Sequence, residues 1–136
     1  MKTSECKLKV RYAETSTMGF MHHSNYLVWY DLAQEKLLAD CGTSYAKIMQ
    51  QGFHALPIRN VCNYALPVCY DDEITVRISV TGIQGVKMSF AYEFFRARDG
   101  AIVATGESEH IIVNSEMRPV PIERALPGLY GLFMRG

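Results

Sequence analysis

The sequence has no excess of charge of either sign, since its 14 lysines and arginines balance 14 aspartates and glutamates. Proteins that bind nucleic acid or an anionic membrane surface usually carry a basic patch or a net positive charge. Because neither is visible here, we expect no nucleic acid and no membrane among the partners. An anionic ligand would have to be bound by a few local cations.

Long apolar runs are also missing. No stretch of about 18 apolar residues is present, so we expect no membrane-spanning helix. Residues 1–9 read MKTSECKLK and lack the apolar core of a secretory signal. The four cysteines form no Cys-x-x-Cys pair, and their spacing matches no common zinc site. These absences predict a cytoplasmic protein with reduced thiols.

Apolar residues make up 49% of the chain, which predicts one ordered domain over residues 1–136. The first secondary-structure signal lies at residues 6–12, where apolar and charged side chains alternate. Alternation with a period of two is typical of a strand with one buried face. We expect Val10 and Tyr12 on that face. Residues 13–23 break the pattern and indicate a loop.

A helix is predicted for residues 24–41, because the apolar positions now recur every three or four residues. Ser24 is a suitable N-cap, and Gly42 suits the left-handed position that follows a helix. Leu27 widens the apolar face, whereas Gln34 lies off it. The helix would be about 27 Å long, enough to lie along a sheet with strands of about eight residues. The positions that define the face are Tyr26, Tyr30, Ala33, Leu37 and Cys41.

The second half of the chain is rich in strand patterns, after a short helix predicted within residues 43–51. Strands joined by short turns pair antiparallel, and Asp99–Gly100 is a strong hairpin signal. Prolines in the tail argue against a strand in its middle. One long helix with an apolar face needs a sheet to cover it, so the predicted class is α+β, with a five-stranded antiparallel sheet wrapped around the helix. The four later strands are expected at 58–66, 73–81, 86–98 and 102–113.

The candidate chemistry lies in residues 11–26, which read RYAETSTMGFMHHSNY. This segment joins the first strand to the helix and brings a carboxylate, hydroxyl groups and two histidines to the helix N-terminus. Unpaired backbone N–H groups and the positive end of the helix dipole favour negative charge there. Such N–H groups can polarise a carbonyl and stabilise the oxyanion that forms when it is attacked. A polar connector that only caps the helix is the alternative interpretation.

Several residues of this segment are in register with a known signature, namely Tyr12, Glu14, Thr15, Gly19, His23, Ser24, Asn25 and Tyr26. On these residues the chain resembles the 4-hydroxybenzoyl-CoA thioesterase-like hotdog family. Within that family it is closest to the bacterial acyl-CoA thioesterases that include the Tol-Pal-associated enzymes. The turn PVCYDD at residues 67–72 and the strands around Asp99–Gly100 also resemble the family. The resemblance therefore extends over most of the chain.

The resemblance implies a hotdog fold and hydrolysis of an acyl-CoA (or acyl-carrier) thioester to a free acid and a thiol. It also implies a homodimer or homotetramer with the active site at the subunit interface, and it implies no metal or redox cofactor. The oxyanion would be bound by the backbone N–H of His23. We assign substrate-binding roles to Gly19, His22, Asn25 and Tyr26.

One position departs from the family pattern, because Ser16 stands where the family has its catalytic aspartate. A serine hydroxyl is not ionised near neutral pH and needs help to act as a nucleophile or base. In a first account, Glu14 takes over as the base. In a second, Ser16 is a nucleophile activated by Glu14 or by a neighbouring histidine. In a third, the protein is a non-catalytic acyl-thioester binding protein.

Other residues of the segment have expected structural roles. The adjacent His22 and His23 side chains are expected to diverge, which argues against a metal shared between them. Tyr26 and Trp29 are expected in the core or the pocket wall, and Asn25 could orient carbonyl groups of the loop. The sequence does not name the acyl group. It also leaves open which cations meet the CoA phosphates, the candidates being Arg59, Arg77, Lys87, Arg96 and Arg118.

Overall fold

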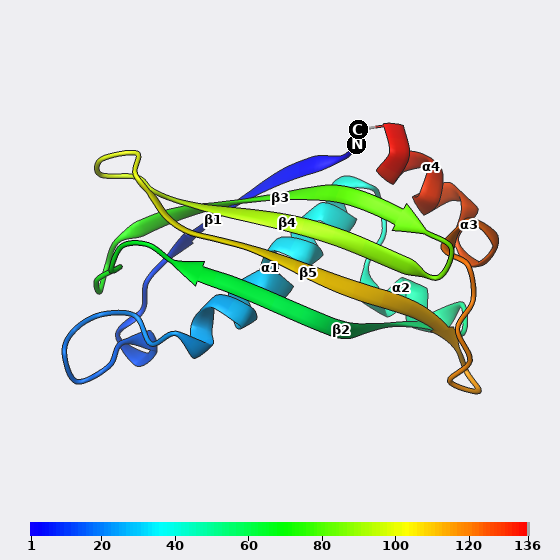
Figure 1. Ribbon diagram of the computed structural model, residues 1–136, viewed down its shortest axis with the longest axis horizontal. Coiled ribbons are helices and arrows are strands. Elements are labelled where there is room, and N and C mark those ends of the chain that lie inside the picture. Colours follow the sequence, from blue (N-terminus) through cyan, green and yellow to red (C-terminus); the bar gives the residue numbers. More distant parts are fainter. Residues whose placement is uncertain (136) are drawn as a thin grey trace.

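The computed structural model describes residues 1–135. Figure 1 shows one antiparallel sheet with a single long helix lying across one face, as predicted. No helix within the described residues is both long enough and apolar enough to cross a membrane. In the order in which they lie side by side, the strands are β1 (Thr3–Lys9), β3 (Glu73–Gln84), β4 (Lys87–Arg96), β5 (Ile102–Asn114) and β2 (Phe53–Tyr64).

Helix α1 (Ser24–Asp40) has the length that its apolar period predicts. Cys41 is its C-cap, and Gly42 follows with a φ of 77°, the left-handed conformation predicted for it. The predicted N-cap is wrong by one residue, because His23 precedes the helix and Ser24 is its first residue. The buried side chains of α1 are Tyr26, Trp29, Tyr30, Ala33, Gln34, Leu37 and Leu38.

Two residues of α1 lie on the opposite side from that predicted. Gln34, expected off the apolar face, is only 4% exposed, whereas Leu27, expected on it, is 41% exposed. Gln34 lies one turn after Tyr30 and therefore points at the sheet as well. Its amide finds hydrogen-bond partners there, which offsets the cost of burying a polar group.

The strand limits differ from the prediction most clearly in β1 and β2. The ladder with β3 supplies partners only as far as Lys9. Tyr12 therefore lies outside the sheet, in a 3₁₀ turn (Tyr12–Glu14), and is 78% exposed instead of buried. Strand β2 starts at Phe53, earlier than predicted, and includes Pro57. A proline is tolerated there because β2 is an edge strand, where one side of the ladder is unpaired.

Three short helices lie at the end of the molecule where α1 finishes, as Figure 1 shows. They are α2 (Tyr45–Gln50), as predicted, and α3 (Ile122–Ala125) and α4 (Pro127–Arg135) in the tail. Ile122 and Phe133 are fully buried, so the tail contributes to the core. The four cysteines are free thiols.

A tyrosine of α1 reaches across the sheet to its edge strand. The ring of Tyr30 stacks on Tyr92 with 3.8 Å between the ring centroids. Its hydroxyl donates a hydrogen bond of 2.6 Å to the carbonyl oxygen of Val61 in β2. Gly106 of β5 lies directly against this hydroxyl, and an added Cβ would overlap the tyrosine oxygen. The contact therefore requires glycine and fixes α1, β5 and β2 to one another.

A buried hydrogen-bonded network lies beside this stack, between α1, α2, β4 and β5. Gln34 donates from Nε2 to the Tyr92 hydroxyl over 2.8 Å and accepts at Oε1 from the Tyr45 hydroxyl over 2.6 Å. Nε2 of Gln34 also lies 3.4 Å from His110 Nε2, and because an amide nitrogen can only donate, His110 Nε2 accepts there. His110 Nε2 then also accepts from Ser108 Oγ over 2.9 Å, and Ser108 Oγ accepts from the Tyr92 hydroxyl over 2.7 Å. His110 Nε2 is therefore an acceptor, and the proton of the neutral imidazole is on Nδ1.

We expect this histidine to make the fold less stable between pH 6.5 and pH 4. Burial lowers the pKa of His110 from 6.5 to about 4. In this window the unfolded chain binds a proton that the folded protein does not, so the contribution to stability is complete above pH 6.5 and is lost as the pH falls toward 4. The loss should be about 2 kcal/mol between pH 7.5 and pH 4.5.

Urea unfolding at both pH values measures this loss. In His110→Gln nothing titrates at this position, so its free energy of unfolding should change less between the two pH values than that of the wild type. The surface carboxylates titrate in both proteins and cancel in the difference. An identical pH dependence in the two proteins would contradict the assignment.

Candidate active site

The segment between β1 and α1 forms a tight loop. The backbone N–H of Ser16 donates to the carbonyl of Phe20 over 2.7 Å, and the N–H of Gly19 donates back to the Ser16 carbonyl over 3.0 Å. Gly19 supplies the turn, because its φ of 83° is a conformation that few other residues adopt. An isolated bridge between Phe20 and Cys69 fastens the loop to the segment after β2. These contacts connect the two ends of the loop and anchor it to the segment after β2.

A cavity of about 380 Å³ opens beside this loop, at the start of α1. Four of the predicted site residues line it, namely Ser16, His22, His23 and Tyr26. The other wall comes from the end of β2 and the residues after it, including Tyr64 and Leu66. The remaining predicted site residues Glu14, Gly19 and Asn25 are not among the lining residues.

Glu14 points into the protein, where its carboxylate is fully engaged. Oε2 accepts a 2.8 Å hydrogen bond from the indole N–H of Trp29, and Oε1 accepts one of 2.8 Å from the backbone N–H of Arg11. Burial alone would raise the pKa of Glu14, but the hydrogen bonds from Arg11 and Trp29 and the nearby guanidinium outweigh it and hold the pKa below its usual value. The residue is only 4% exposed. This arrangement gives Glu14 a structural role in fixing the loop to α1.

Glu14→Gln tests whether that role is the main one. The amide is a weaker acceptor for two buried donors, so we expect a loss of about 1–3 kcal/mol in the free energy of unfolding. The matched control is Glu5→Gln in β1, where Glu5 forms an exposed ion pair with Arg77 of β3. This change should cost less than about 1 kcal/mol. Both are measured by urea unfolding. A thiol-release rate that collapses in Glu14→Gln without loss of stability would instead assign Glu14 as the base.

Asn25 makes the loop contacts expected of it. Its side-chain Nδ2 donates to the carbonyl of Glu14 over 2.9 Å and to the carbonyl of His22 over 3.2 Å. The N–H of His22 also donates to the Glu14 carbonyl, over 2.8 Å. Asn25 therefore acts by positioning the loop on the first turn of α1.

The first turn of α1 leaves one backbone N–H without an acceptor in the described part of the chain. The N–H groups of Asn25 and Tyr26 donate to carbonyls of the turn that precedes them. The N–H of His23, a residue that lines the cavity, has no hydrogen-bond acceptor within residues 1–135. A free N–H at the positive end of a helix is suited to bind a carbonyl oxygen that gains negative charge.

The two histidine rings lie against each other, and the predicted divergence is wrong. Their centroids are 4.2 Å apart with 31° between the ring planes. The backbone already turns into the helix at His23, with φ −57° and ψ −29°, so the two side chains do not alternate as they would in a strand. Nδ1 of His22 accepts from the N–H of Ser24 over 3.2 Å. The proton of neutral His22 is therefore on Nε2, which makes its free nitrogen a donor.

Comparison with known proteins decides the family. The profile of the Thioesterase-like superfamily matches residues 10–127. The chain belongs to the thioesterase-like superfamily. It is 29% identical over 128 residues to the "Putative acyl-CoA thioesterase YneP" of Bacillus subtilis (strain 168), with 93% of this chain and 92% of that protein covered.

Two further relatives agree with this membership. The acyl-CoA thioester hydrolase YbgC of Escherichia coli O157:H7 is 23% identical over 123 residues, which cover 88% of this chain and 87% of that protein. The crystal structure of the DHNA-CoA thioesterase from Staphylococcus aureus gives a TM-score of 0.92 at 26% identity, covering 99% of this chain and 91% of that one. The predicted hotdog fold is therefore confirmed.

Ser16 lines the candidate site in this member of the thioesterase-like superfamily. The family resemblance places a catalytic carboxylate at this position. Here Ser16 Oγ borders the cavity and accepts a long hydrogen bond of 3.4 Å from the N–H of Met18. Within residues 1–135 no hydrogen bond joins Ser16 Oγ to the ring of His22 or His23. This geometry does not favour a serine activated directly by either ring.

Sequence reasoning missed the wall formed by Tyr64 and Leu66. Tyr64 packs edge-on against Tyr26 with ring centroids 5.0 Å apart. Contacts with β5, distant in sequence, place both residues: Tyr64 pairs with Ala104, and the N–H of Leu66 donates to the carbonyl of Val103. The usable signal was Pro67, because a strand that stops at a proline leaves its last side chains at the sheet end.

The cations considered for the CoA phosphates all have acidic neighbours. Arg96 is nearly buried and holds the segment after β2 in place, because it donates to the Pro67 carbonyl over 2.9 Å and pairs with Asp99 at 2.7 Å. The others form exposed or half-exposed ion pairs between 2.9 and 3.8 Å, namely Arg59, Arg77, Lys87 and Arg118.

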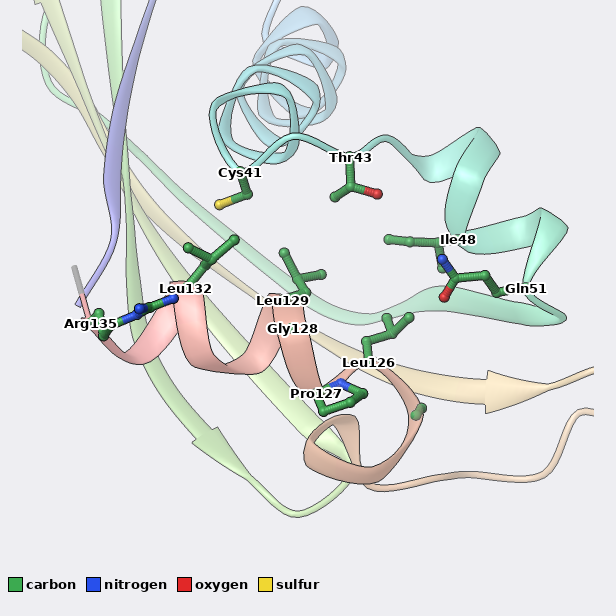
Figure 2. A pocket seen from close by; sticks show the side chains of 11 residues that line it. Cys41, Thr43, Ile48, Gln51, Leu126, Pro127, Gly128, Leu129, Leu132 and Arg135 are labelled. Atoms are coloured by element: carbon green, nitrogen blue, oxygen red, sulfur yellow. The ribbon is translucent and has the colours of Figure 1, made fainter.

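A second, larger cavity of about 460 Å³ lies at the other end of α1 (Figure 2). Figure 2 shows Leu129 and Leu132 of α4 pointing toward Cys41 and Thr43. Cys41 is the cysteine that lines this cavity. Burial raises the pKa of its thiol, which leaves the thiol un-ionised and weakly nucleophilic near neutral pH. The cavity at the start of α1 is therefore the better candidate for thioester chemistry.

Proposed function

We propose that this protein hydrolyses an acyl-CoA (or acyl-carrier) thioester to a free acid and a thiol in the cavity at the start of α1. The observation that carries the proposal is the free N–H of His23 at the positive end of α1, beside a cavity that Ser16 also lines. The thioester carbonyl oxygen would bind to this N–H. Membership of the thioesterase-like superfamily supports the same reaction.

In the proposed reaction, a water oxygen attacks the thioester carbonyl carbon. The carbonyl electrons move onto the oxygen, which the His23 N–H stabilises. Collapse of this intermediate reforms the carbonyl and expels the CoA thiolate, which takes up the proton that the water has lost. The hydroxyl of Ser16 orients the water by hydrogen bonding, and the imidazole of His23 is the proposed acceptor of its proton. Without an ionised carboxylate beside the water, we expect slow turnover.

The alternative is an acyl-thioester binding protein that does not cleave its ligand. Two observations favour it. Ser16 replaces the carboxylate that the resemblance implies, and Glu14 is held away from the cavity by Trp29 and Arg11. The cavity would then retain affinity for the thioester but lack the base.

Thiol release from short, long and aromatic acyl-CoAs, followed with a thiol-reactive dye, tests the proposal. The wild type should release thiol, Ser16→Ala should release it more slowly, and both should bind the same ester in a thermal-shift assay. Binding without any thiol release would establish the alternative. Absence of both binding and release across the panel would reject the two functions together.

We also propose a cytoplasmic homodimer or homotetramer, as the family resemblance implies. The support is the unpaired edge of β2, which carries exposed Ile58 and Tyr64, together with exposed Leu27 and Val28 on α1. A long unpaired strand beside exposed apolar side chains is a surface that soluble proteins usually cover. Light scattering should give at least twice the 15.4 kDa chain mass. A monomer at all concentrations would contradict the proposal.

A further inference from the structure

The cavity at the end of α1, of about 460 Å³, shares no lining residue with the one at the start of the helix. Its walls come from three parts of the chain, namely the end of α1 with the residues after it, α2, and the tail with α3 and α4. Small-molecule sites in proteins usually have volumes of about 300 to 1,000 Å³. This cavity is therefore large enough to bind a ligand of its own.

The walls of this cavity are mostly apolar. Ile48 of α2 and Leu126 and Leu129 of the tail line it and are at most 8% exposed. Leu132 is half-buried, and Figure 2 shows its side chain pointing toward Cys41. An apolar chain that lies against these side chains is removed from water, which is favourable in proportion to the area buried. The walls therefore suit a ligand whose larger part is apolar.

The only charged residue among those that line the cavity in the described part of the chain is Arg135. Its Nε donates to the carbonyl of Gly131 over 3.2 Å, and Figure 2 shows its side chain directed back along α4 toward Leu132. Within residues 1–135 no carboxylate lies within ion-pair distance of this guanidinium. Its remaining N–H groups are therefore available to a bound anion.

A second cation lies at the same end of the cavity. The backbone N–H of Lys2 donates to a carbonyl near the end of α4 over 2.9 Å. Burial raises the pKa of Cys41, and the charge of Lys2 opposes this rise, so the ammonium group lies near the thiol that lines the cavity. The carboxylate of Asp40 is also near, but it already accepts from Ser4 Oγ over 2.6 Å and from Lys36 over 2.9 Å. The charges here favour an anion.

We propose that this cavity binds the free anion of a straight-chain carboxylic acid. The carboxylate would accept hydrogen bonds from the guanidinium of Arg135, and the alkyl chain would lie against Leu132, Leu129 and Ile48. The volume equals that of roughly fifteen water molecules, which is enough for a chain of about ten carbons with its carboxylate. The site lies apart from Ser16, so the proposal does not depend on thioester hydrolysis.

Isothermal titration calorimetry with three probes of equal chain length tests the charge preference. Decanoate is anionic, decanol is uncharged and decyltrimethylammonium is cationic. Decanoate should bind about fivefold more tightly than decanol, which is the upper range for an exposed ion pair, and the cation should bind more weakly than decanol. Octanoate should bind roughly 15-fold more weakly than decanoate, because it buries two fewer methylene groups.

Two matched pairs of variants locate the site. Arg135→Gln should remove the preference for decanoate over decanol, whereas Arg124→Gln, at an exposed position of α3 outside the cavity, should keep it. Leu132→Asp places a carboxylate in the cavity and should weaken decanoate binding at least about tenfold. Met134→Asp, at an exposed position of α4 outside the cavity, should leave it within about threefold. If Leu132→Asp does not fold, the arginine pair still decides the matter.

Protection of Cys41 from alkylation shows where decanoate binds. Cys41 lines the cavity, whereas the equally half-buried Cys69 lies beside Phe20, in the loop before α1. Saturating decanoate should slow the labelling of Cys41 by iodoacetamide and leave that of Cys69 unchanged, as read by mass spectrometry of peptides.

Three results would overturn the proposal. The first is equal affinity for decanoate and decanol in the wild type, and the second is an unprotected Cys41. The third is displacement of decanoate by acetyl-CoA, which would show that the acid occupies the thioester site. Failure of thiol release, by contrast, bears only on the cavity at the start of α1.

Discussion

Replacing Ser16 with aspartate is expected to raise the rate of thiol release by about 10²- to 10⁴-fold, the usual contribution of a positioned base. The position borders the cavity beside the free N–H of His23, so a carboxylate there can accept a proton from the attacking water. The new charge would also lie near the positive end of α1, which favours its ionised form. The measurement is kcat with the acyl-CoA that the wild type binds best.

The control for this variant is Thr17→Asp, which adds the same charge to an exposed position of the same loop. It should leave the rate within about threefold of the wild type. A Ser16→Asp protein that folds and binds the ester but shows no gain would mean that the attacking water does not pass this position. The active site would then be built differently from the one proposed.

Replacing Gly106 with alanine is expected to cost about 3 kcal/mol of stability, at the upper end for overpacking by one methyl group. The new Cβ would overlap the Tyr30 hydroxyl and lie 2.5 Å from the carbonyl oxygen of Val61. The tyrosine is held by its stack on Tyr92, and the carbonyl is part of a strand, so neither moves easily. Thermal unfolding should show a fall in Tm of roughly 10 °C.

Gly82 provides the matched control, because it also lies in a strand and an added Cβ there meets nothing within 4 Å. Gly82→Ala should change the free energy of unfolding by less than about 1 kcal/mol. Combining Gly106→Ala with Tyr30→Phe should recover part of the loss, because the overlapping hydroxyl is gone. Simple additivity of the two changes would show that the clash is not between these residues.

The periodicity of the sequence was sufficient for α1 and for the five strands along the chain. It did not give their arrangement in the sheet, because β2 pairs with β5 and not with β3, the next strand in sequence. The four-three-four spacing of apolar residues from Tyr26 onward reports directly on a helix buried along one side. The same rule failed at Gln34 and Tyr12. Gln34 is buried because hydroxyl groups of α2 and β4 meet its amide, and Tyr12 is exposed because β3 offers no ladder partner beyond Lys9. Both outcomes depend on partners distant in sequence, which a local pattern does not contain.

In the candidate site, too, the sequence predicts where the segment lies but not how its side chains are directed. The segment from Ser16 to Tyr26 could be located from its residue types and its place before a helix. The direction of each side chain could not, because Glu14 turns inward to meet the indole of Trp29, a full helix turn into α1. The donor on His110 was beyond sequence reasoning altogether, since it follows from four side chains on three elements that orient one another's protons.

The strand order has a consequence for how the chain is made. Strand β2 leaves the ribosome early, yet its partner β5 follows only about 40 to 60 residues later, since Tyr64 pairs with Ala104 and Phe53 with Asn114. At usual synthesis rates this is a wait of roughly 2 to 12 s. Until β3, β4 and β5 have been made, the apolar face of α1 also lacks most of the sheet that covers it. The nascent chain, not the finished protein, is therefore the species most exposed to aggregation and most dependent on chaperones.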